Sequence, residues 1–152
     1  MLMKFKLSQR SIDRMKGIDP DLQKVVEEAI KITEVDFGVT CGMRTVAEQE
    51  ELVAKGASQT MKSKHLEGRA VDLVAYLGPR ISWELNLYDD IANAIAIAAA
   101  KVNIPIKWGA AWTVGDISTY QGKMEDAMNE YIDLRRSKGR RPFIDAPHFE
   151  MI

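Results

Sequence analysis

The chain contains two histidines, His65 and His148, and each lies in a local sequence that suits a metal site. His65 stands in the segment Ser-Lys-His-Leu-Glu-Gly-Arg-Ala-Val-Asp, which ends at Asp72, and His148 follows the sequence Asp-Ala-Pro. Gly68 permits a sharp turn between His65 and Asp72, and this turn can fold His65 back beside Asp72. Asp72 interrupts an apolar segment, where an unpaired charge is costly, and a metal ion is a sufficient partner for it.

Two histidines and one aspartate are a suitable ligand set for a catalytic zinc ion, because three protein ligands leave the fourth position for water. A structural zinc site usually has four ligands, often thiolates, and this chain has one cysteine. We expect that residue, Cys41, to be a small buried side chain. From residue types alone a second interpretation stays open, in which both histidines are surface residues or simply hydrogen-bonded.

Helical and extended patterns alternate along the chain and indicate the elements that must position these residues. Asp19 and Pro20 are typical of a helix start, and Thr45 with Glu48 forms a capping box. Ser82 is the expected cap of a long apolar helix. We predict helices at 20–33, 46–55, 83–101 and 123–137, and strands at 36–41, 70–76, 105–108 and 147–152.

The two segments that carry the metal-site residues both read as strands. Asp72 lies on the opposite face of the 70–76 strand from its apolar neighbours, and His148 shares a face with Glu150 in the 147–152 strand. Because the ligands come from both segments, we expect these strands to lie side by side. Short strands interleaved with helices, without a βαβ rhythm, predict an α+β fold in which a small antiparallel sheet carries the zinc site and helices pack on one face.

Composition places the chain among globular proteins, and we expect a single domain over residues 1–152. A net charge of −1 lacks the basic excess of a typical nucleic-acid binder, so we expect no nucleic-acid partner. The most apolar run, at 91–100, is far below the roughly 20 residues that cross a bilayer, so we expect no membrane insertion. The N-terminus lacks the apolar region of a signal peptide, which predicts synthesis in the cytoplasm.

The motifs strongly resemble the D-Ala-D-Ala carboxypeptidase and dipeptidase superfamily of zinc peptidases, and within it the phage L-alanyl-D-glutamate endopeptidases, which are small endolysins. The resemblance runs in order from about residue 20 to the C-terminus. It implies a hedgehog or D,D-peptidase-like fold. Three patterns carry it: S-x-H-x-x-G-x-A-x-D with a later D-x-x-H, G-x-R-T, and G-x-x-W. Their residues here are Ser63, His65, Gly68, Ala70, Asp72, Asp145, His148, Gly42, Arg44, Thr45, Gly109 and Trp112.

The resemblance implies roles for the residues that match these patterns. His65, Asp72 and His148 would hold the zinc ion. Asp145 would be the general base, which takes the proton of the attacking water and later delivers it to the leaving amine. Arg44 would stabilise the oxyanion of the transition state.

The remaining site residues carry open alternatives. The resemblance implies that Ser63 contacts the substrate, although a serine in a loop can also simply be solvated. Trp112 would form a wall of the substrate cleft, or else pack in the core. Glu150 is the competing general base because it shares a face with His148, and we interpret it as a support of the site instead. The stretch 114–141 is longer than we expect in the smallest endolysins.

We therefore predict a zinc-dependent peptidoglycan peptidase that hydrolyses a stem-peptide bond, as an L-alanyl-D-glutamate endopeptidase in phage lysis. As an endolysin it would be antimicrobial, act as a monomer on the stem peptide, and leave the host cytoplasm for the cell wall with the help of a holin. One alternative is a D,D-carboxypeptidase that removes the terminal D-alanine. An alternative of another class is a non-catalytic wall-binding domain on the same fold, which the presence of Asp145 and Arg44 beside all three ligands disfavours.

Overall fold

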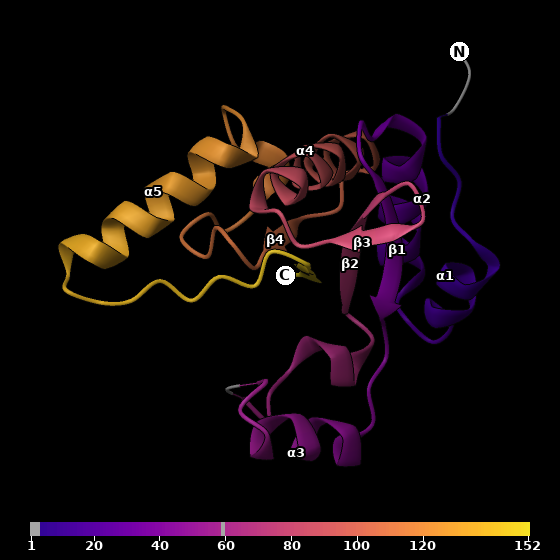
Figure 1. The fold of residues 1–152 in the computed structure, drawn as a ribbon, viewed down its shortest axis with the longest axis horizontal. Coiled ribbons are helices and arrows are strands. Elements are labelled where there is room, and N and C mark those ends of the chain that lie inside the picture. The colour runs from indigo at the N-terminus through magenta and orange to yellow at the C-terminus, as the bar shows by residue number, and fades with distance from the viewer. Residues whose placement is uncertain (1–3, 59) are drawn as a thin grey trace.

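The computed structural model describes residues 4–58 and 60–152, and its centre is one antiparallel sheet (Figure 1). The strand order is β1-β2-β5-β4, and β3 pairs with the end of β2. Each of these pairings is antiparallel, so the predicted α+β class with a small antiparallel sheet is confirmed. The strands are β1 (Asp36–Cys41), β2 (Ala70–Leu77), β3 (Arg80–Ser82), β4 (Ile106–Trp108) and β5 (His148–Met151).

The described residues also form five helices and two 3-10 turns. Figure 1 shows α3 set apart beyond the end of β1, and α5 projecting outward, with the chain after it running back toward β5. None of the helices in the described residues has the length and apolarity to span a membrane. The helices are α1 (Gln9–Arg14), α2 (Pro20–Ile32), α3 (Val46–Ala54), α4 (Leu85–Val102) and α5 (Met124–Ser137), and the 3-10 turns are η1 (Lys64–Glu67) and η2 (Ile117–Thr119).

The pairing of β2 with β5 joins two segments that are far apart in the chain. Asp72 is the register partner of His148, and Ala70 is the partner of Glu150. Directly opposed residues in an antiparallel pair carry their side chains on the same face. The expectation that these two strands lie side by side is therefore confirmed, and it places the aspartate and the histidine next to each other.

The other face of the sheet forms the core. Val71, Leu73 and Phe149 alternate with the site residues and are buried. They belong to the same apolar cluster as Ile91 and Ile95 of α4, which are also buried, as a helix packed on this face requires. Each such side chain contributes about 1.5–3 kcal/mol through burial. The site residues are thus held from behind by a close-packed layer.

The beginning of α4 differs from the prediction. The expected helix at 83–101 with Ser82 as its cap begins instead at Leu85, and the N-cap Glu84 makes no capping hydrogen bond through its side chain. Ser82 is the last residue of β3, and its carbonyl oxygen accepts a hydrogen bond of 2.8 Å from the hydroxyl of Tyr88. Ser82 therefore pairs with Ala75 in the sheet, although its local sequence predicted a helix cap.

Candidate metal centre and active site

Three of the predicted residues converge on one point. His65 from η1 places its Nε2 atom 3.2 Å from Asp72 Oδ1, and His148 at the start of β5 places its Nδ1 atom 3.2 Å from the same oxygen. The two imidazole rings lie 5.1 Å apart between centroids. A tetrahedral zinc ion with bonds of about 2.1 Å has ligand atoms about 3.4 Å apart. Each of the two histidine-to-aspartate distances is therefore close to the ligand spacing of a tetrahedral zinc site.

Each histidine has a second partner on its other nitrogen. The Nδ1 atom of His65 lies 2.8 Å from the carbonyl oxygen of Gly42, to which it can only donate. The Nε2 atom of His148 lies 2.8 Å from Glu150 Oε1. When the rings are neutral, these contacts select the tautomers in which the remaining nitrogen of each ring offers a lone pair on the Asp72 side, as metal-binding histidines require. The position of Glu150 agrees with its interpretation as a support of the site.

The protein without a metal ion holds protons in this cluster. Burial disfavours the imidazolium forms, but hydrogen bonds to Asp72 outweigh it and raise the pKa of His65 to about 10 and that of His148 to about 9. Burial likewise opposes the charge of Asp72, yet the two histidines hold its pKa well below the usual range. A dication that binds between them would displace these protons, so metal binding and proton release are coupled.

Cys41 lies on the far side of His65. The residue is partly exposed, which corrects the expectation of a buried side chain. It is the last residue of β1, where the pairing with β2 shifts register between Val39 and Cys41. Cys41, His65 and Asp72 have ligand atoms within 4.8 Å of one another. However, the sulfur lies 3.7 Å from Nδ1 of His65, whereas Asp72 faces Nε2. One ion cannot use both nitrogens of a ring, and the Asp72 side is the one that His148 completes.

A tight turn places Asp145 near the cluster formed by His65, Asp72 and His148. The backbone N–H of Asp145 donates to the carbonyl oxygen of Gly109 at 2.8 Å, and the N–H of His148 donates to the carbonyl oxygen of Asp145 at 3.0 Å. The buried indole of Trp108 donates to the carbonyl oxygen of Ala146 at 2.8 Å. The end of β4 therefore fixes the turn from two sides.

A cavity of about 430 Å³ opens in front of this turn. Burial and the negative charge of Asp72 raise the pKa of Asp145, and the positive charges of His148, His65 and Arg44 oppose that rise. Such a carboxyl group suits a base that must hold a proton for part of a reaction. The cavity wall contains every predicted site residue other than Asp72, namely Arg44, Ser63, His65, Trp112, Asp145 and His148.

Arg44 is held rigidly at the cavity. Its guanidinium donates to Asp72 Oδ2 at 3.3 Å and to the side-chain oxygen of Gln49 at 3.0 Å, and its backbone N–H donates to the carbonyl oxygen of His65 at 2.9 Å. None of the sequence motifs includes Gln49. The only signal for it would have been a glutamine on the inward face of α3, where it is fully buried.

Trp112 lies against the metal centre, with its ring 5.9 Å from that of His148 and 6.4 Å from that of Phe143. Phe143 was not predicted. It is held by Tyr131 of α5, whose hydroxyl donates to the Phe143 carbonyl oxygen at 3.1 Å and accepts from its N–H at 3.0 Å. The long stretch 114–141 is thus linked to the cavity through Phe143, which lies just beyond its end.

Ser63 caps the turn that carries His65, because its hydroxyl accepts a hydrogen bond of 3.2 Å from the His65 N–H. Gly68 ends the turn with a φ of +69°, and a Cβ atom there would lie 2.8 Å from the carbonyl oxygen of Gly17. The serine and the glycine of this motif therefore have structural reasons to be present. Substrate contact by Ser63 stays a prediction.

The chain is similar to known proteins. Residues 3–152 match the family described as phage L-alanyl-D-glutamate peptidase. An L-alanyl-D-glutamate peptidase of Escherichia phage T5 is 32% identical over 114 residues, which cover 72% of this chain and 83% of that protein. One of Listeria phage A118 is 37% identical over 71 residues, or 47% of this chain and 24% of that protein.

The fold is also that of a solved enzyme. The crystal structure of the Serratia marcescens L-Ala D-Glu endopeptidase ChiX matches with a TM-score of 0.72 and 32% identity, covering 98% of this chain and 92% of that one. The family match extends over nearly the whole sequence and includes every predicted site residue. The chain therefore belongs to the phage L-alanyl-D-glutamate peptidase family.

Proposed function

We propose that this protein is a zinc-dependent peptidase that hydrolyses the L-alanyl-D-glutamate bond of peptidoglycan stem peptides in phage lysis. The observation that carries the proposal is the contact of His65 and His148 with the same oxygen of Asp72, beside Asp145, in a chain of this family. The relatives named above favour this endopeptidase over a D,D-carboxypeptidase.

We assign three atoms as the zinc ligands: His65 Nε2, Asp72 Oδ1 and His148 Nδ1. Their second partners support the assignment, since Gly42 and Glu150 occupy the other nitrogens of the two rings. Three protein ligands leave one position for water, and two of the three ligand residues line the cavity.

The chain supplies the proton transfers and the charge stabilisation. Zinc, when bound, would lower the pKa of a bound water and polarise the scissile carbonyl. Asp145 stands outside the ligand set and takes the proton of the attacking water, which it then delivers to the leaving amine of the D-glutamyl residue. The guanidinium of Arg44 faces the cavity and stabilises the negative charge that develops on the carbonyl oxygen of the substrate.

The test compares Asp145→Asn with Glu150→Gln in zinc-loaded protein that digests purified peptidoglycan. Asp145→Asn keeps the shape of the side chain but removes the base, so turnover should fall by about 10²–10⁴-fold while zinc content stays unchanged. Glu150→Gln is the matched control and should lose less activity at saturating zinc.

Mass analysis of the fragments identifies the bond, because cleavage after L-alanine leaves peptides that begin with D-glutamate. Release of terminal D-alanine alone would instead establish the carboxypeptidase alternative. Full turnover in Asp145→Asn, together with inactivity of Glu150→Gln, would show that Glu150 and not Asp145 is the general base. Activity that survives strong chelation would refute metal dependence.

A further inference from the structure

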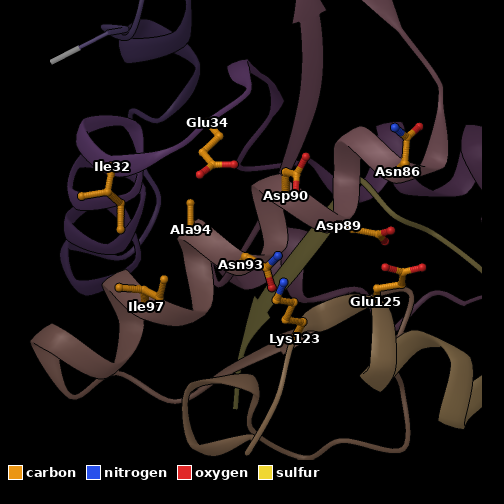
Figure 2. A pocket seen from close by; sticks show the side chains of 10 residues that line it. All are labelled: Ile32, Glu34, Asn86, Asp89, Asp90, Asn93, Ala94, Ile97, Lys123 and Glu125. Carbon is orange, nitrogen blue, oxygen red and sulfur yellow. The ribbon is translucent and has the colours of Figure 1, made fainter.

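A second cavity, of about 400 Å³, lies where α4 meets the start of α5 (Figure 2). It shares no lining residue with the candidate active site. Its wall is rich in oxygen atoms and in negative charge. The charged residues of its wall are four carboxylates and one lysine: Glu34, Asp89, Asp90, Glu125 and Lys123.

Asp89 is the unusual member of this group. It is only 8% exposed, and its buried Oδ1 atom has no hydrogen-bond partner in the part of the chain that the structure describes. Figure 2 shows its carboxylate directed toward that of Glu125. Burial and the negative charges of Glu125 and Asp90 raise the pKa of Asp89 to about 6, so the group is still mostly ionised at neutral pH. A buried charge in this state lacks compensation.

Lys123 does not provide that compensation. Among the described residues, no ion pair joins it to any of the four carboxylates. Figure 2 shows its ammonium group beside Asn93, away from the space between Asp89 and Glu125. The carboxylate pair therefore faces the cavity without a cation of its own.

The backbone around the pair is fixed. The side-chain oxygen of Asn93 in α4 accepts a hydrogen bond of 2.8 Å from the N–H of Met124, the first residue of α5. This bond sets the first turn of α5 against α4 and so holds Glu125 close to Asp89. The two carboxylates are thus preorganised rather than brought together by flexible side chains alone.

We propose that this cavity binds a hard divalent cation, with calcium as the best match, between the carboxylates of Asp89 and Glu125. Calcium accepts carboxylate oxygens together with water in a flexible shell. The described lining residues include no histidine or cysteine, the ligands that would favour zinc or copper. The Oδ1 atom of Asp89 has almost no contact with solvent, so a small bare ion can reach it more easily than an organic ammonium group.

The bound ion would join α4 to α5. It would thereby stabilise the helix that holds Phe143 at the active-site cavity through Tyr131. The proposed cation site is independent of the proposed peptidase function, and thermal stability reports its occupancy.

The experiment measures thermal unfolding of the zinc-loaded protein with calcium chloride and, separately, with sodium chloride at equal ionic strength. At a hundredfold excess of calcium over the dissociation constant, the Tm should rise by about 5–10 °C. Sodium chloride should produce no comparable rise. An unchanged Tm at about 10 mM calcium, above the 10⁻⁴–10⁻³ M dissociation constants of weak calcium modules, would overturn the proposal.

Variants locate the site. Asp89→Asn and Glu125→Gln should each abolish the calcium-dependent shift, whereas Asp126→Asn should retain it. Asp126 lies in the same first turn of α5 but outside the cavity wall. The shift is compared within each variant, so a change in intrinsic stability does not affect the result. The assignment would be overturned if Asp89→Asn kept the full calcium-dependent rise in Tm. It would also be overturned if Asp126→Asn lost as much of that rise as Asp89→Asn.

Discussion

Substituting Gly109 by alanine tests how closely the segment after β4 must approach the turn before β5 to build the site. The N–H of Gly109 donates to the carbonyl oxygen of His148 at 2.8 Å, and its own carbonyl oxygen accepts from the N–H of Asp145. A Cβ atom at this position would lie 2.3 Å from the carbonyl oxygen of Asp145 and 3.0 Å from the Cβ atom of His148. Gly109 is not among the positive-φ glycines, so the expected effect is steric.

The size of the effect follows from these distances. A carbon and a carbonyl oxygen pack no closer than about 3.3 Å, so the Asp145 backbone must move by about 1 Å. A displacement of that size can reduce a rate by about 10²-fold. The shift would move the proposed base and the adjacent ligand His148 together. We therefore expect kcat/KM of Gly109→Ala to fall by about 10²-fold, with weaker zinc binding.

The assay follows hydrolysis of a synthetic peptide that contains one L-alanyl-D-glutamate bond, and zinc content is measured on the same samples. Gly115→Ala is the matched control, because a Cβ atom there meets nothing within 4 Å. Both variants should remain folded by circular dichroism. Wild-type turnover and zinc content in Gly109→Ala would refute the reasoning that this close approach positions the site.

Three further predictions concern other parts of the molecule. Glu150→Gln weakens the acceptor for His148, so zinc affinity should fall by about 10–100-fold in a chelator competition; unchanged affinity would contradict a supporting role. Arg44→Lys keeps the charge but loses the fork that contacts Asp72, so kcat should fall by at least about tenfold in steady-state kinetics. The pKa of Asp89 is raised from 3.8 to about 6, so ionisation costs stability as pH rises through that window. In calcium-free buffer Asp89→Asn should therefore be more stable than wild type at pH 8, by up to about 3 kcal/mol in urea unfolding, and a difference that persists below pH 4 would refute this cause.

Local signals in the sequence were sufficient for most elements. The capping box at Thr45 and Glu48 forms as expected, and Asp19 with Pro20 starts α2. The alternation around Asp72 identified both the strand and its two faces. These signals work because they depend on neighbours within a few residues, where backbone geometry is determined by short-range hydrogen bonds and side-chain periodicity.

Elements and residues whose place depends on strand pairing or on one particular side-chain contact were missed. The short strand β3 exists because it pairs with β2, and this pairing displaced the predicted helix cap at Ser82. Phe143 and Gln49 had no local pattern that indicated a site. Each is positioned by a side-chain contact that no periodic pattern marks: Tyr131 holds Phe143, and Arg44, five residues earlier in the chain, contacts Gln49.

The donor types that could meet, two imidazoles and a carboxylate, are evident from the amino-acid sequence, because the motif residues carry that chemistry wherever they lie. Which nitrogen of each ring faces Asp72 depends on the folded structure. The carbonyl oxygen of Gly42 occupies one side of His65, and Glu150 occupies one side of His148. A ring nitrogen becomes a ligand or a donor according to the hydrogen bond on its opposite side, and for His65 that bond comes from a segment 23 residues away in the chain.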